Sequence, residues 1–124
     1  MLAGIYNMTC QQGATFARTL TLRYPDPESP AIDPVYLLWN FTGYTARMQV
    51  RRTLQSTTPM ISLTTENGRI TLGGVTGVIE LLISATDTAQ ITSSGVYDLE
   101  IISSSGVVSR VIQGDFILSE EVTR

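Results

Sequence analysis

Apolar and polar residues alternate without a break along Thr42-Gly43-Tyr44-Thr45-Ala46-Arg47-Met48-Gln49-Val50-Arg51. Successive side chains of a β-strand point to opposite faces, so a period of two separates the apolar residues from the polar ones. The residues expected to face a core are Tyr44, Ala46, Met48 and Val50, and those expected to face solvent are Thr45, Arg47, Gln49 and Arg51. The stretch therefore predicts a half-buried strand.

The same period recurs on both sides of this stretch. It predicts further strands at residues 5–9, 14–24, 60–64, 69–72, 78–84, 96–102 and 107–118. The inward residues expected in the later strands are Ile61, Leu63, Ile70, Leu72, Ile79, Leu81, Ile83, Tyr97, Leu99 and Ile101. Only residues 84–91 break the period, and Ser84 is suited to cap a short helical turn there.

Two local signals add detail to this pattern. The Asn67-Gly68 pair predicts a tight hairpin between residues 60–64 and 69–72. Gly114, inside the last strand, indicates a β-bulge.

Seven or eight short strands with regularly spaced turns predict an all-β protein. We expect a single domain over residues 1–124, an antiparallel immunoglobulin-like β-sandwich with one short helical crossover. A closed barrel would give the same pattern. Residues 1–11 could pair within the chain or be exchanged with another subunit, because edge strands pair readily across chains.

Composition argues against several classes of function. The sequence has no histidine, and Cys10 is its only cysteine, so the usual acid/base catalyst and the usual zinc ligands are missing. We expect no catalytic residue, no metal and no cofactor. The net charge is −3 and the arginines are scattered, which argues against nucleic-acid binding. No apolar run has the length of a signal peptide or of a membrane span, so we expect synthesis in the cytoplasm and no membrane partner.

Four of the five prolines lie at positions 25, 27, 30 and 34, which predicts a proline-rich loop insertion over about residues 25–41. This loop ends in an unusually apolar run, residues 35–41. The run either folds back to cap the end of the sandwich or anchors a protein–protein contact, where Trp and Tyr are enriched. The candidate interface residues are Tyr36, Leu37, Leu38, Trp39, Phe41, Arg47 and Arg51.

The charged candidates have competing explanations. Arg47, Arg51 and Arg52 form a basic stripe that either faces an acidic partner or keeps a sheet edge soluble. Asp98 and Glu100 suit a cation or an arginine on a neighbouring chain, although a solvated strand face explains them better. The acidic residues at 26, 28 and 33 lack the spacing of a calcium loop.

Several segments, taken in order, resemble a family of small structural proteins of tailed bacteriophages and prophages. They are residues 12–16, 41–51, 63–70, 83–88, 95–100 and 121–124, and they include Thr42-Gly43-Tyr44-Thr45 and Tyr97-Asp98-Leu99. The resemblance implies a β-sandwich that attaches receptor-binding apparatus to the tail or baseplate. The sequence departs from that pattern at residues 24–41, where the proline-rich insertion replaces a short turn.

On this resemblance we expect a non-enzymatic virion subunit, an adaptor at the tail, baseplate or fibre attachment. It would be made in the host bacterial cytoplasm and would contact other virion proteins in many copies of a symmetric assembly. One alternative is a capsid cement or head-decoration protein. Another is a carbohydrate-binding sandwich for host-surface recognition, with Tyr36, Trp39 and Asn40 as the sugar-contacting cluster.

Overall fold

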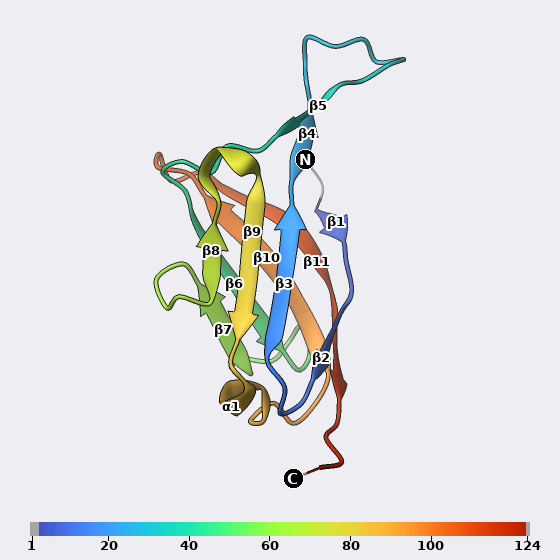
Figure 1. The fold of residues 1–124 in the computed structure, drawn as a ribbon, viewed down its shortest axis with the longest axis vertical. Helices are drawn as coiled ribbons and strands as arrows, with labels where there is room; N and C mark the ends of the chain where they lie inside the picture. Colours follow the sequence, from blue (N-terminus) through green and yellow to red (C-terminus); the bar gives the residue numbers. More distant parts are fainter. Residues whose placement is uncertain (1–2, 124) are drawn as a thin grey trace.

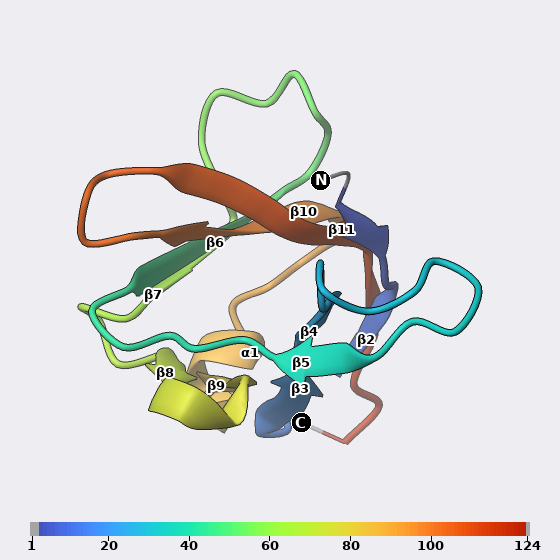
Figure 2. The same cartoon turned by 90° about the horizontal axis from the view of Figure 1, so that it is seen from above.

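Two layers of β-sheet enclose the core in the computed structural model, which describes residues 3–123 (Figures 1 and 2). The described part contains the strands β1 (Gly4–Ile5), β2 (Met8–Gln11), β3 (Phe16–Thr21), β4 (Arg23–Pro25), β5 (Tyr36–Leu38), β6 (Thr45–Arg51), β7 (Ile61–Thr64), β8 (Ile70–Leu72), β9 (Val78–Ile83), β10 (Gly95–Ile102) and β11 (Val108–Ser119). A short 3-10 helix, η1, spans Gly74–Thr76, and the helical turn α1 spans Ala85–Thr88. The protein is therefore mostly β, as predicted.

The larger layer, sheet A, has the strand order β1-β11-β10-β6-β7, and β2 also pairs with β11. The smaller layer, sheet B, has the order β3-β9-β8. Both β1 and β2 run parallel to β11, so the expectation of a wholly antiparallel fold is wrong for sheet A. The N-terminal segment pairs with the last strand of its own chain. It is divided into two short strands rather than the single one predicted.

The side chains between the layers are those that the period of two placed inward. Ala46, Met48 and Val50 of β6 are almost fully buried, as are the predicted inward residues of β9 and β10. Tyr44 and Leu72 are only half-buried at the margin of the core. The alternation in the sequence therefore identified the core face of each central strand correctly.

The helical turn begins as predicted. The Ser84 hydroxyl accepts a hydrogen bond from the backbone N–H of Asp87 at 3.2 Å, which satisfies a free donor of the first turn. No helix in residues 3–123 is long and apolar enough to cross a membrane.

The predicted hairpin at Asn67-Gly68 is wrong. The strand before it, β7, pairs with β6 in sheet A, and the strand after it, β8, pairs with β9 in sheet B. The Asn67 side-chain oxygen accepts hydrogen bonds from the backbone N–H groups of Thr64 and Arg69, at 3.0 and 3.1 Å. These bonds stabilise a corner at which the chain changes sheets, with Gly68 at a φ of 79°.

The bulge lies three residues before the predicted position. Leu99 pairs with Ile112 while Glu100 pairs with Arg110, so the unpaired residue is Val111. Gly114 is in regular register. It is needed for another reason, because a Cβ atom at 114 would lie 2.5 Å from the backbone oxygen of Tyr6, where the segment between β1 and β2 runs beside β11.

Candidate functional site

The proline-rich insertion is not simply a loop, because its ends form an antiparallel pair. β4 and β5, with the connecting residues 26–35, make a two-stranded ribbon that projects beyond both sheets at the end opposite α1 (Figure 1). Tyr24 lies opposite Leu37, and the backbone N–H of Asp26 continues the ladder to the oxygen of Val35 at 2.7 Å. Pro25 ends β4, and the prolines at 27, 30 and 34 lie in the connection, where no ladder donor is required.

The base of the ribbon continues the hydrogen-bond ladder of the body. The Leu22 N–H donates to the Gly77 oxygen at 2.8 Å, and the Trp39 N–H donates to the Leu22 oxygen at 3.0 Å. Gly77 has a φ of 71°, and a Cβ there would lie 2.7 Å from the Leu22 oxygen. The ribbon is therefore joined to the body through backbone bonds.

A row of aromatic rings covers the core beneath the ribbon. The Trp39 ring lies 5.7 Å from that of Tyr24 and 6.2 Å from that of Phe41, and Phe41 lies 6.0 Å from Tyr44. Phe41 is 2 % exposed, and Trp39 is partly buried against the core. Of the two interpretations of the apolar run, capping of the sandwich describes these two residues.

The other members of the run remain on the surface. Tyr36 is 58 %, Leu37 38 % and Leu38 43 % exposed. Val35 and Ile32, in the connection, are 55 % and 96 % exposed. The ribbon therefore presents apolar side chains that the body does not cover.

The two arginines of the predicted interface lie elsewhere, on the outer face of sheet A. The Arg47 Nε atom is 2.8 Å from a Glu100 carboxylate oxygen. Arg51 donates to the side-chain oxygen of Gln49 at 2.6 Å and to the backbone oxygen of Ser56 at 2.7 Å. The partners of both arginines lie on or beside sheet A and none is in the ribbon. The structure therefore does not bring these arginines together with the ribbon residues.

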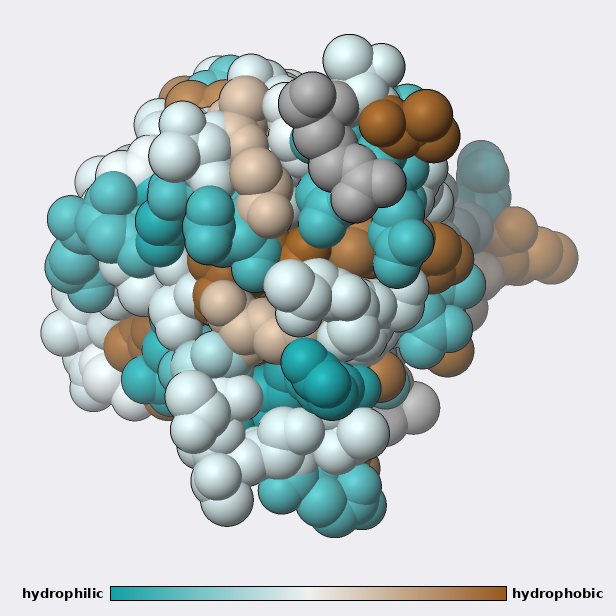
Figure 3. Space-filling model, turned by 90° about the horizontal axis from the view of Figure 1, so that it is seen from below, coloured by the Kyte–Doolittle hydropathy of each residue, from teal (hydrophilic) through white to brown (hydrophobic). Residues whose placement is uncertain are grey.

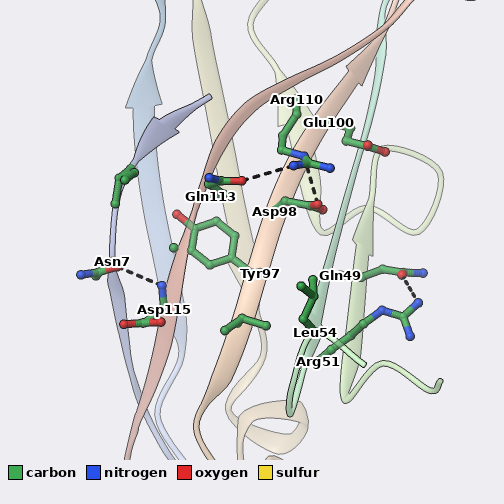
Figure 4. A pocket seen from close by; sticks show the side chains of 13 residues that line it. Asn7, Gln49, Arg51, Leu54, Tyr97, Asp98, Glu100, Arg110, Gln113 and Asp115 are labelled. Carbon is green, nitrogen blue, oxygen red and sulfur yellow. Dashed lines mark hydrogen bonds and ion pairs between the residues drawn. The ribbon is translucent and has the colours of Figure 1, made fainter. Parts of the chain in front are cut away.

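That outer face also carries an open groove of about 690 Å³, which sequence reasoning missed (Figure 4). Polar side chains of β6, β10 and β11 form its floor, including Gln49, Asp98 and Gln113. Ile5 and Leu54, which are 79 % and 81 % exposed, stand at opposite rims. The outward residues were visible as an alternating pattern, but the groove requires the strand order β6-β10-β11 and the position of the 52–59 loop.

Charges within the groove are largely paired with one another. The Arg110 Nε atom lies 3.3 Å from an Asp98 carboxylate oxygen, and Arg110 also donates to Gln113 at 3.4 Å. Asp98 and Glu100 were suggested as contacts for a cation or for an arginine on a neighbouring chain, and each instead has an arginine of the same chain as its partner. The lining carries charges of both signs, with Arg51 and Arg110 beside Asp98, Glu100 and Asp115, and is not a field of one sign.

The proposed sugar-contacting cluster does not assemble on one surface. Tyr36 and Trp39 are three residues apart in extended chain, so their side chains leave opposite faces of the ribbon. The Trp39 ring packs against the rings of Tyr24 and Phe41. The Asn40 side chain accepts a hydrogen bond from the backbone N–H of Thr42 at 3.0 Å.

The thiol of Cys10 and the carboxylate of Asp87 are held by the packing and hydrogen bonds of the fold. Cys10 is fully buried, and this burial raises the pKa of its thiol. Arg69 and Ser84 donate hydrogen bonds that lower the pKa of Asp87 at the start of α1. Among residues 3–123, no group of three or more His, Cys, Asp or Glu side chains is placed to hold a metal ion.

The end opposite the ribbon has a different surface. Seen from the α1 end, hydrophilic and neutral side chains dominate, with hydrophobic areas interspersed (Figure 3). The projecting apolar ribbon therefore marks one end of the molecule.

Neither the protein-family models nor the curated proteins compared with this sequence give a match.

Proposed function

We propose that the chain is a non-enzymatic structural subunit of a tailed-phage virion, an adaptor at the tail, baseplate or fibre attachment that acts through protein–protein contacts. One observation carries this proposal: the ribbon projects from the body and exposes Val35, Tyr36, Leu37 and Leu38. Full burial of an exposed large apolar side chain contributes about 1.5–3 kcal/mol of favourable free energy. The exposed ribbon is thus a surface whose burial by a neighbour is favourable.

The way the ribbon is held supports a docking role. Its base is fixed by backbone hydrogen bonds at Leu22 and Trp39 and by the aromatic row beneath them. The ribbon therefore loses little conformational entropy when it binds a partner. The assignment to a virion depends on the ordered sequence resemblance given above. The strand orders β11-β10-β6-β7 and β3-β9-β8 support an immunoglobulin-like sandwich as its framework.

The experiment is incorporation into particles. Phage or prophage particles would be assembled with wild-type chain, with a Tyr36→Ser, Leu38→Ser double variant, and with Leu82→Ser as control. Leu82 is 51 % exposed on β9, far from the ribbon in the fold, so it matches the exposure of the tested residues. Thermal unfolding of each purified protein would verify that the variants remain folded.

We expect wild type and the control to be incorporated and the double variant to be lost from particles. Incorporation of the double variant at the wild-type level would contradict docking through the ribbon. Absence of the wild-type chain from particles would contradict the virion role itself. Cryo-electron microscopy of the wild-type particle distinguishes the tail adaptor from the alternative, a cement protein on the capsid shell.

A further inference from the structure

The outer edge of β5 is an unpaired strand edge. In an antiparallel ladder, hydrogen-bonded and non-hydrogen-bonded residue pairs alternate. The bonds from Asp26 to Val35 and from Trp39 to Leu22 place residues 35, 37 and 39 in the hydrogen-bonded pairs with the β4 side. The N–H and C=O groups of Tyr36 and Leu38 therefore point away from β4, and no other strand in residues 3–123 pairs with β5.

The two edges of the ribbon differ in their capacity to accept another strand. By the same alternation, the outward groups of β4 belong to Arg23 and Pro25, and proline has no N–H to donate. Proline and charged residues are the usual protection of an exposed edge. β5 consists of Tyr36, Leu37 and Leu38 and has neither, so the ribbon is blocked on one side and open on the other.

We propose that β5 pairs antiparallel with β5 of a second copy of this chain, about a two-fold axis at Leu37. Tyr36 then lies opposite Leu38 of the second copy, and each such pair exchanges both backbone hydrogen bonds, because all four groups point outward. The two ribbons become one four-stranded sheet. This inference rests on the proposed function in one respect: a many-copy particle brings the chains together.

The side chains in this register are complementary. On one face, Tyr24 and Leu37 of each copy form a single apolar row across the sheet. On the other face, the row contains Arg23 and Leu38 of one copy, followed by Tyr36 and Pro25 of the other. No like charges are opposed, since the two Arg23 residues lie in different rows at opposite edges. Each of the exposed side chains of β5 gains a cross-strand neighbour on its own face of the sheet.

The size of the contact predicts its strength. A stable complex buries about 800 Å² per partner, and a three-residue strand with its flanks supplies far less. Pairing of free chains is therefore weak and reversible. It becomes effective where an assembly raises the local concentration to the millimolar range. The test must consequently trap the pair covalently.

A cysteine at the axis provides this trap. Leu37 lies opposite itself in a non-hydrogen-bonded pair, where Cα atoms are about 4.5 Å apart, within the range of about 4.4–6.8 Å for a disulfide. Cys10 is 0 % exposed, so the new thiol is the accessible one. We expect purified Leu37→Cys protein to form disulfide-linked dimers rapidly at high concentration under a mild oxidant.

Two variants control for random collision. Val35 directly precedes β5 and shares the face of Leu37, but the two copies of residue 35 would be about 13 Å apart along the strand direction, so Val35→Cys is a matched control. Leu82→Cys is exposed on sheet B. Neither variant should cross-link at the rate of Leu37→Cys. Equal rates for all three variants would overturn the proposal.

Two further measurements test the register and the edge. A mixture of Tyr36→Cys and Leu38→Cys chains should give heterodimers faster than either variant alone gives homodimers. Adding Leu38→Lys to Leu37→Cys should suppress the dimer, whereas adding Leu82→Lys should not. A dimer that survives Leu38→Lys unchanged would contradict pairing through this edge.

The pairing and the proposed function can fail separately. Loss of cross-linking with ribbon-dependent incorporation into particles would leave the virion role and overturn self-pairing. Specific cross-linking of a chain that is absent from particles would leave the pairing and overturn the virion role.

Discussion

The hydroxyl group of Tyr97, on β10, donates a hydrogen bond to the backbone oxygen of Tyr6, between β1 and β2. The Tyr97 side chain is buried in the core, and this burial raises the pKa of its phenol well above the usual 10. The N-terminal segment is thus held against sheet A by a buried side chain as well as by its ladder with β11. Two predictions follow from this junction.

A Tyr97→Phe variant should be less stable than wild type at neutral pH by about 1 kcal/mol, since one intramolecular hydrogen bond is lost. The difference should shrink at high pH. The unfolded tyrosine ionises near pH 10 while the folded one stays protonated, so wild type loses stability as the pH rises above 10. Denaturant unfolding between pH 8 and 11.5 checks this, and parallel curves for the two proteins would contradict it.

A Gly114→Ala variant should lower the free energy of unfolding by about 1–3 kcal/mol, because the added Cβ forces a backbone shift in a close-packed region. That atom would lie 2.5 Å from the Tyr6 oxygen. A matched control is Gly4→Ala on β1, where the nearest atom to an added Cβ is 3.8 Å away. Urea unfolding should show a clear loss for Gly114→Ala and a small change for the control.

Replacement of Trp39 should lower the stability of the fold, whereas replacement of Tyr36 should leave it nearly unchanged. Trp39→Ala should cost about 2–3 kcal/mol, less than a fully buried tryptophan, because its ring supports Tyr24 and Phe41 but is partly exposed. Tyr36→Ala should change stability by no more than about 0.5 kcal/mol, as for an exposed site. Thermal unfolding separates the two, and equal losses would show that the ribbon is part of the folding core.

Acid should weaken the ion pair between Arg69, which directly precedes β8, and Asp87 of α1. Arg69 holds the pKa of Asp87 below its usual 3.8, so the stability from this pair is present above that pH and is lost as the pH falls through the lowered pKa. Asp87→Asn and Arg69→Gln should each flatten the stability curve where the pH falls below 3.8. A wild-type slope in both variants would show that other carboxylates govern acid unfolding.

The period of two predicted the core because it depends only on which side of a strand each residue leaves. Residues 46, 48 and 50 are buried for this reason. Pairing partners are not contained in that pattern. Asn67-Gly68 has the composition of a hairpin turn, yet β7 and β8 each find a longer partner in a different sheet.

The candidate surfaces were only partly predictable for the same reason. The prolines correctly marked an irregular segment, but Pro25 sits at the end of an edge strand, where its missing N–H costs nothing. The apolar run divided into a buried and an exposed part because Trp39 and Phe41 reach the core while Tyr36 and Leu38 lie further out on the ribbon. The groove on sheet A depends on strands distant in sequence.

The parallel pairing of β2 with β11 has a mechanical consequence. The chain enters near the ribbon end and leaves near the α1 end, so tension applied to its two ends pulls β2 and β11 past each other along their length (Figure 1). The hydrogen bonds between Met8–Gln11 and the end of β11 then bear the load together, in shear, and cannot be opened one at a time. The pairing of β2 with β11 would therefore resist unfolding when the two ends of the chain are pulled apart.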